Sequence, residues 1–147
     1  MPGEKQKDSA IEEFGLAISL LLRRIRANAP PEVREFSWTQ KAVLSRLERD
    51  GPATAADLAR AEGVKPQSMG TALAALEEMS LIERKAHPTD GRQLLVKLSD
   101  KGNLLRKNIR AAKHAWLNNA IARLSAPEQA MLFKAGELIA RMVEEDK

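Results

Sequence analysis

Apolar residues recur at helical spacing in the first part of the chain. Between residues 9 and 28 they fall three or four positions apart, which predicts a helix with one apolar face formed by Ile11, Phe14, Ile18, Leu21, Leu22 and Ile25. The stretch Ala29-Pro30-Pro31 then ends this helix. A second helix is predicted over residues 38–49, because Ser37 and Gln40 have the spacing of a capping box. Its buried side is expected to contain Ala42, Val43, Leu47 and Trp38.

Two short helices are predicted next. The first starts at Thr54, whose side chain is placed to cap it, and closes at Gly63. The second has Pro66 in its first turn, where proline is favoured, and runs to about Met79. Two short helices joined by a tight turn form a helix-turn-helix unit.

A pair of strands follows the second short helix. Residues 81–86 and 94–98 have the composition of strands, and in the second of them Leu94, Val96 and Leu98 alternate with the other positions. Between them, residues 88–91 have the proline, aspartate and glycine of a turn. A hairpin attached to a helix-turn-helix unit is a wing, so the sequence predicts a winged helix.

Two longer helices are predicted after the wing. One covers residues 101–123, and the other covers residues 127–144 behind a capping box formed by Ser125 and Glu128. Their apolar surface exceeds what a small winged helix can cover, so we expect a helical dimerisation layer over residues 8–29 and 101–145, with contacts by Ile11, Phe14, Leu138 and Met142. The predicted fold is therefore mainly α with a small β-hairpin wing. We expect one domain over residues 1–147, within which residues 36–100 form the winged lobe.

Charge points to a polyanionic partner. The 147 residues carry a net charge of +4, but residues 84–110 alone contain eight lysines and arginines against Asp90 and Asp100. A basic block that coincides with a predicted wing favours nucleic-acid binding over a merely solvated helix face.

Several other classes of protein are disfavoured. The absence of cysteine excludes disulfides, thiol redox sensing and cysteine-ligated zinc. His87 and His114 are far apart in the predicted order of elements, so we expect neither a metal site nor a catalytic group, and no enzyme. No apolar run approaches the roughly 18 residues of a membrane span, and residues 1–9 are too polar for a secretory signal, so we expect a cytoplasmic protein with no membrane contact.

The chain resembles the MarR family of bacterial transcriptional regulators along nearly its whole length. The most specific marker is Asp90-Gly91-Arg92, followed by Leu98-Ser99 and Gly102, with Ser99 in place of the more common threonine. Residues 63–69 are similar to the start of the family's recognition helix, and residues 76–84 to its exit. The resemblance implies a homodimer that binds double-stranded DNA on the bacterial nucleoid. It also implies a pocket for small aromatic anions, and the expected activity is that of a repressor relieved by an unidentified small-molecule effector, with no cofactor.

The helix from residue 66 to 79 is the expected recognition helix. Met69, Ala72, Leu73 and Leu76 form its core stripe, which leaves Gln67, Ser68, Gly70, Thr71 and Ala74 on the opposite face. A glutamine can recognise adenine, hydroxyl groups can contact bases or phosphates, and a glycine allows close approach of the backbone. An interior helical glycine costs about 1 kcal/mol relative to alanine, so Gly70 indicates a functional reason.

At the wing, Arg92 is expected to enter a minor groove, and Asp90 is expected to orient its guanidinium rather than contact DNA. Phosphate contacts are expected from Lys65, Arg84 and Lys85. A protonated His87 would be able to contact phosphate as well, but a histidine that is satisfied within the protein or solvated is favoured. The operator should be a pseudo-palindrome with half-sites about one helical turn apart, roughly 10 bp. The alternative is a winged-helix module that binds protein, and it lacks the steep salt dependence of DNA binding.

Overall fold

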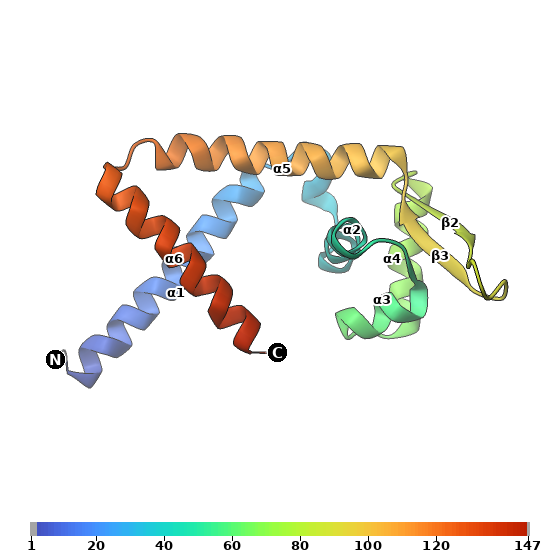
Figure 1. Cartoon of the computed structure of the whole chain (residues 1–147), viewed down its shortest axis with the longest axis horizontal. Coiled ribbons are helices and arrows are strands. Elements are labelled where there is room, and N and C mark those ends of the chain that lie inside the picture. The colour runs from blue at the N-terminus through green and yellow to red at the C-terminus, as the bar shows by residue number, and fades with distance from the viewer. Residues whose placement is uncertain (1–2, 147) are drawn as a thin grey trace. The chain divides into compact units, whose positions relative to one another are not determined.

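A computed structural model of the chain describes residues 3–146, so positions 1 and 2 of the polar start and position 147 lie outside the described residues. The chain divides after Ala112 into two compact units. Helix α5 (Asp100–Ile121), labelled in Figure 1, contributes residues to both. Within residues 3–146, no helix is both long and apolar enough to span a bilayer.

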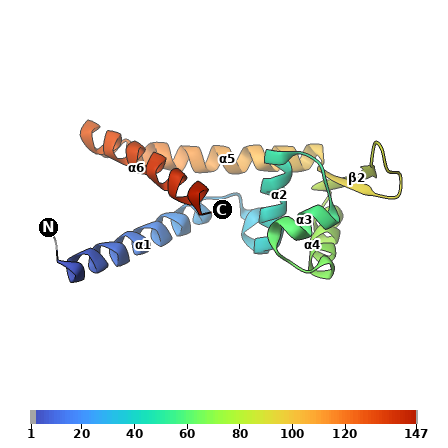
Figure 2. The same cartoon turned by 60° about the horizontal axis from the view of Figure 1, so that its bottom comes forward.

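The first unit contains the winged lobe, and its class is the predicted one. Helices predominate, and the only sheet in the described part of the chain is small and antiparallel. Its elements are α1 (Glu4–Ala27), the 3-10 helix η1 (Pro31–Glu35), α2 (Trp38–Asp50), β1 (Ala53–Thr54), α3 (Ala55–Glu62), α4 (Pro66–Glu78), β2 (Ile82–Ala86) and β3 (Leu94–Leu98). In Figure 2 the turn between β2 and β3 projects beyond helices α3 and α4.

The structure confirms the side-chain caps that were predicted to begin the helices. The Ser37 hydroxyl accepts the backbone N–H of Gln40 at 3.1 Å, and the Gln40 side chain accepts the N–H of Ser37 at 2.8 Å. The reciprocal pair Ser125 and Glu128 starts α6 (Ala126–Glu145) in the same way. Gly63 closes α3 in the left-handed conformation, with φ of 63°. Helix α1 begins at Glu4, earlier than predicted. The sequence did not indicate this start, because the first turns are polar and show no apolar period.

The sheet has one strand more than predicted. Strand β1 pairs with β3, Ala53 opposite Val96 and Thr54 opposite Leu95, so the order is β1-β3-β2. A strand of two residues has no alternation that sequence analysis could detect. The alternation predicted Leu94 on the same face as Val96 and Leu98, but Leu94 does not share their burial, because it lies opposite Ala86 at the tip end of the hairpin, beyond the reach of the core.

The core lies between α2, α4 and the sheet. All four residues of the predicted α4 stripe are buried, and so are Val43 and Leu47 of α2. Leu44, which was not predicted, is also buried, whereas the predicted burial of Trp38 is wrong: 74% of it is exposed. Trp38 is the first residue of α2, at the edge of the lobe, where its ring lies 5.9 Å from the Arg26 guanidinium instead of entering the core.

The exit of α4, the end of β3 and the start of α5 meet at one junction. The Ser99 hydroxyl donates to the Ser80 carbonyl at 2.5 Å and accepts the Gly102 N–H at 3.0 Å. The Ser99 N–H donates to the Leu81 carbonyl at 3.1 Å. A side chain on Gly102 would meet that same carbonyl, since a Cβ there would lie 2.1 Å from its oxygen. The junction therefore requires glycine at this position.

The second unit is a helical hairpin of the last part of α5 and α6. The Gln129 side chain donates to the carbonyls of Ile121 and Leu124, both at 3.1 Å, and so satisfies the end of α5. None of the described residues of α6 is buried in the single chain, and none of α1 is. Whether residues 8–29 and 101–145 form a dimerisation layer around a lobe of residues 36–100 stays a prediction.

We expect Gly102→Ala to lower the free energy of unfolding by about 2–3 kcal/mol, because the new methyl group overpacks a backbone carbonyl that cannot rotate away. The measurement is denaturation in urea.

Gly70→Ala is the matched control. Gly70 is also helical, but nothing lies within 4 Å of a Cβ built on it, so the change should stabilise the chain by up to about 1 kcal/mol. Equal effects of the two changes would contradict the close contact at Gly102.

Candidate nucleic-acid interface

Helix α4 places the predicted base-contacting residues on one exposed face. Gln67, Ser68, Gly70 and Thr71 are all exposed, opposite the buried stripe. The Thr71 hydroxyl donates to the Gln67 carbonyl at 3.1 Å, so its oxygen remains available as an acceptor. A Cβ built on Gly70 would meet nothing within 4 Å outside the backbone of its own helix, so no contact within the chain explains the missing side chain. The face can therefore be approached closely by an external partner.

The start of α4 suits a phosphate group. Lys65 is the N-cap residue and is exposed, and its side chain makes no capping hydrogen bond. The first N–H groups of a helix lack partners within it and carry partial positive charge. An exposed lysine beside them adds a full charge.

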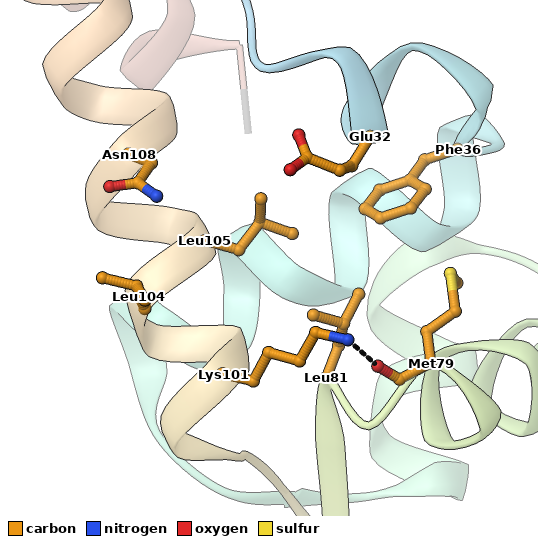
Figure 3. A pocket seen from close by; sticks show the side chains of 8 residues that line it. All are labelled: Glu32, Phe36, Met79, Leu81, Lys101, Leu104, Leu105 and Asn108. Atoms are coloured by element: carbon orange, nitrogen blue, oxygen red, sulfur yellow. Dashed lines mark hydrogen bonds between the residues drawn. The ribbon is translucent and has the colours of Figure 1, made fainter.

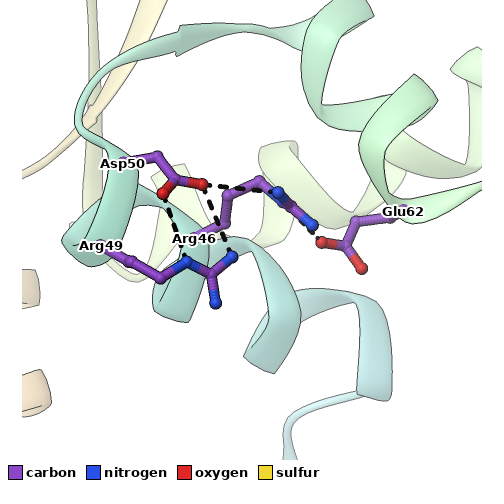
Figure 4. Close-up of polar contacts among 4 residues, drawn as sticks. All are labelled: Arg46, Arg49, Asp50 and Glu62. Carbon is purple, nitrogen blue, oxygen red and sulfur yellow. Dashed lines mark hydrogen bonds and ion pairs between the residues drawn. The ribbon is translucent and has the colours of Figure 1, made fainter. Parts of the chain in front are cut away.

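One ion pair joins α2 to α3, the first helix of the helix-turn-helix unit. In Figure 4, Arg46 of α2 lies between Asp50 and Glu62. Its Nε is 2.8 Å from Glu62 Oε1, just before the Gly63 turn, and its Nη1 is 3.4 Å from Asp50 Oδ2. Because Arg46 and Glu62 are largely shielded from solvent, the pair fixes α3 against α2 better than a surface pair would.

His87 organises the turn of the wing. Its Nδ1 accepts the backbone N–H groups of Thr89 at 3.2 Å and Asp90 at 3.1 Å. The strand ends are closed by the His87 N–H, which donates to the Gln93 carbonyl at 3.0 Å. An imidazole that accepts at Nδ1 carries its proton at Nε2. His87 is therefore satisfied by hydrogen bonds within the wing, which is the interpretation that the sequence favoured over a phosphate contact.

Asp90 contacts the backbone of Arg92 and not its guanidinium. Asp90 Oδ1 accepts the Arg92 N–H at 3.1 Å. A carboxylate two residues before an N–H forms a local turn of this kind readily, whereas the long Arg92 side chain is exposed. Asp90 thus fixes the backbone from which Arg92 projects, which differs from the guanidinium contact expected from the sequence.

Half of the basic block is engaged in ion pairs. Arg84 Nε lies 2.9 Å from Glu77 Oε2, and Lys97 Nζ lies 3.6 Å from Glu83 Oε2 on the neighbouring strand. Arg106 and Arg110 both contact Glu48 of α2. Within residues 3–146, four of the eight cations have no carboxylate partner, namely Lys85, Arg92, Lys101 and Lys107. Glu77 was missed by sequence analysis, because no local spacing indicates a partner across the α4–β2 turn.

A pocket of about 320 Å³ lies beside the exit of α4, against η1 and the start of α5. Figure 3 shows Phe36, Leu104 and Leu105 on its apolar walls and Glu32 and Lys101 as its charged groups. Lys101 Nζ donates to the Met79 carbonyl at 2.9 Å, a carbonyl at the C-cap of α4. A group that binds in this pocket would therefore lie next to the end of the candidate recognition helix.

A crystal structure of Streptococcus pneumoniae FabT in complex with DNA shares this fold. It superposes with a TM-score of 0.72 at 20% identity, over 95% of this chain and 99% of that chain.

Two curated relatives resemble the chain in sequence. An HTH-type transcriptional regulator of Mycobacterium tuberculosis is 35% identical over 133 residues, which cover 90% of this chain and 92% of the relative. An HTH-type transcriptional repressor of the same species, Rv2887, is 32% identical over 118 residues, 76% of this chain and 85% of the relative.

The MarR family model matches residues 36–94, which include the winged lobe up to the start of β3. The chain belongs to the MarR family of HTH-type transcriptional regulators, which are not enzymes.

Proposed function

We propose that the chain is a homodimeric repressor that binds a pseudo-palindromic operator in double-stranded DNA. The observation that carries this proposal is the exposed face of α4, with Gln67, Ser68, Gly70 and Thr71, next to a wing that ends in Arg92. Helix α4 would lie in the major groove and Arg92 in the adjacent minor groove. The DNA complex of FabT and the repressor among the relatives support this reading. Its place of action would be the bacterial nucleoid.

The dimer in this proposal rests on exposed apolar side chains. Ile11 and Phe14 of α1 are 60% and 48% exposed, and Leu138 and Met142 of α6 are 42% and 62% exposed. Apolar surface of this kind marks an interaction site. A second copy would cover it and supply the second recognition helix, which a pseudo-palindrome with half-sites roughly 10 bp apart requires.

In this proposal, a small molecule that binds in the pocket beside α4 relieves repression. A ligand with an aromatic body and an acidic group would place the body against Phe36 and Leu105 and the acid near Lys101. The repressor function requires no cofactor. The pocket adjoins α4 through the bond from Lys101 to the Met79 carbonyl, which supports a coupling between ligand binding and the recognition helix.

The two kinds of DNA contact are separated by two substitutions, assayed on a duplex that the wild-type chain selects from a random library. Arg92→Ala should weaken binding to both the selected and a mixed-sequence duplex and reduce the salt slope by about one unit per chain, since a cation leaves the interface. Gln67→Ala should cost about 1–3 kcal/mol on the selected duplex and relax discrimination at one base position. If no sequence is enriched and binding is insensitive to salt, the chain is a protein-interaction module instead.

Asp90 offers a test in which charge and geometry predict opposite signs. Asp90→Ala removes a negative charge near DNA, but it also removes the acceptor that fixes the Arg92 N–H, so we expect weaker binding. Asp90→Asn is the matched control, because it keeps a carbonyl oxygen at the same position and loses the charge, so binding should be at least as tight as in the wild type. Titrations at about 50 and 200 mM salt check both. Tighter binding by Asp90→Ala at both salt concentrations would reduce Asp90 to a passive surface residue.

A further inference from the structure

The side chain of Arg84 lies on the inner side of the wing. On β2 it alternates with Glu83 and shares its face with Ile82, which is buried in the core. Arg84 is opposite Val96, which is also buried. Only 30% of its side chain is exposed. Arg84 and Lys85 are both exposed as whole residues, but the Arg84 side chain lies on the face of the strand that is directed toward the lobe.

Arg84 reaches the last turn of α4. Its Nε donates to Glu77 Oε2 at 2.9 Å. Among residues 3–146, this is the only side-chain hydrogen bond or ion pair that joins a strand of the hairpin to α4. This ion pair lies nearer to the tip of the wing than the buried residue Ile82 does. Only two pairs of opposed strand residues, Lys85 with Leu95 and Ala86 with Leu94, separate Arg84 from the turn. The pair thus connects the two elements that read the grooves.

The position of Glu77 is unfavourable without that partner. The last turn of α4 contains Glu77 and Glu78 and no basic residue, although the C-terminal end of a helix carries partial negative charge. Both carboxylates are exposed on the helix that would approach phosphates, and both would be repelled by them. Glu77 is compensated by Arg84, whereas Glu78 makes no ion pair in the described part of the chain.

We propose that Glu77 is a positioning residue for DNA recognition. Its ion pair with Arg84 holds the wing in a fixed orientation against the recognition helix. One N–H of the five on the guanidinium contacts Glu77, and the others remain free to donate to a phosphate. Without Glu77, the Arg84 side chain loses its fixed direction and the wing loses its outermost tie to α4. The wing tip with Arg92 then has no fixed orientation relative to α4 before binding. Fixing that orientation when DNA binds costs entropy.

The inference rests on the proposed DNA binding and is tested on the same selected duplex and a mixed-sequence duplex. Glu77→Gln should weaken binding to the selected duplex about fivefold, the upper end for a partly exposed ion pair, although it removes a negative charge. Glu78→Gln, the matched control one residue later, should bind as tightly as the wild type or slightly tighter. On the mixed-sequence duplex, where exact placement matters less, Glu77→Gln should change affinity little.

Two further variants separate positioning from simple loss of stability. Arg84→Gln should weaken binding at least as much as Glu77→Gln, and the double variant should be no weaker than Arg84→Gln alone, because the two residues act as one unit. The melting temperature of each variant, measured without DNA, shows that the binding change concerns folded protein. The proposal is overturned if Glu77→Gln tightens binding as Glu78→Gln does, or if both duplexes lose affinity equally. If the wild-type chain binds the selected and the mixed-sequence duplex equally well, the proposed function fails, and this inference fails with it.

Discussion

The rest of the lobe depends on the close approach of α5 to the Leu81 carbonyl at Gly102. A methyl group at this position would lie 2.1 Å from the carbonyl oxygen, so the helix can start there only with glycine. Ser99 closes the junction, with bonds to the backbone of Ser80, Leu81 and Gly102. Ser80 itself has a left-handed φ of 61°, which turns the chain sharply out of α4. As a result, the end of α4, the end of β3 and the start of α5 are fixed by the same few hydrogen bonds.

Electrostatics has two separate roles in this chain. Arg106 and Arg110 belong to the basic block, but they bind Glu48 and so attach α5 to α2. Burial acts to raise the pKa of Glu48, and the hydrogen bonds and charges of Arg110 and Arg106 outweigh it and hold that pKa below its ordinary value. This attachment is therefore complete at neutral pH and is lost only as the pH falls through the lowered pKa. Arg92 and Lys85 make no ion pair in the described part of the chain and remain for an external polyanion, and Arg84 keeps further N–H groups beside the one that contacts Glu77.

Local sequence signals predicted the elements well, because caps, turns and apolar stripes act over three to seven residues. Ser37 with Gln40, Gly63 and the stripe of Met69 to Leu76 are examples, and the candidate DNA-binding residues of α4 and the wing tip lie exposed where the pattern placed them. What the sequence could not predict depends on residues far apart in the chain. The pairing of β1 with β3, the exposure of Trp38 and the partner of Arg84 are set by tertiary contacts. The direction of Asp90 toward a backbone N–H, rather than a guanidinium, depends on the exact course of the turn.

The central claim, a two-fold regulator with one recognition helix for each half-site, is tested most directly by the mass of the protein and of its DNA complex. Sedimentation at micromolar concentration should give twice the chain mass of 16.2 kDa, and two chains should bind each selected duplex. Replacing Leu138 and Met142 by aspartate should leave a species of 16.2 kDa, because charges would be buried in an apolar interface. A wild-type monomer that binds an asymmetric half-site with full affinity, one chain per duplex, would contradict the account.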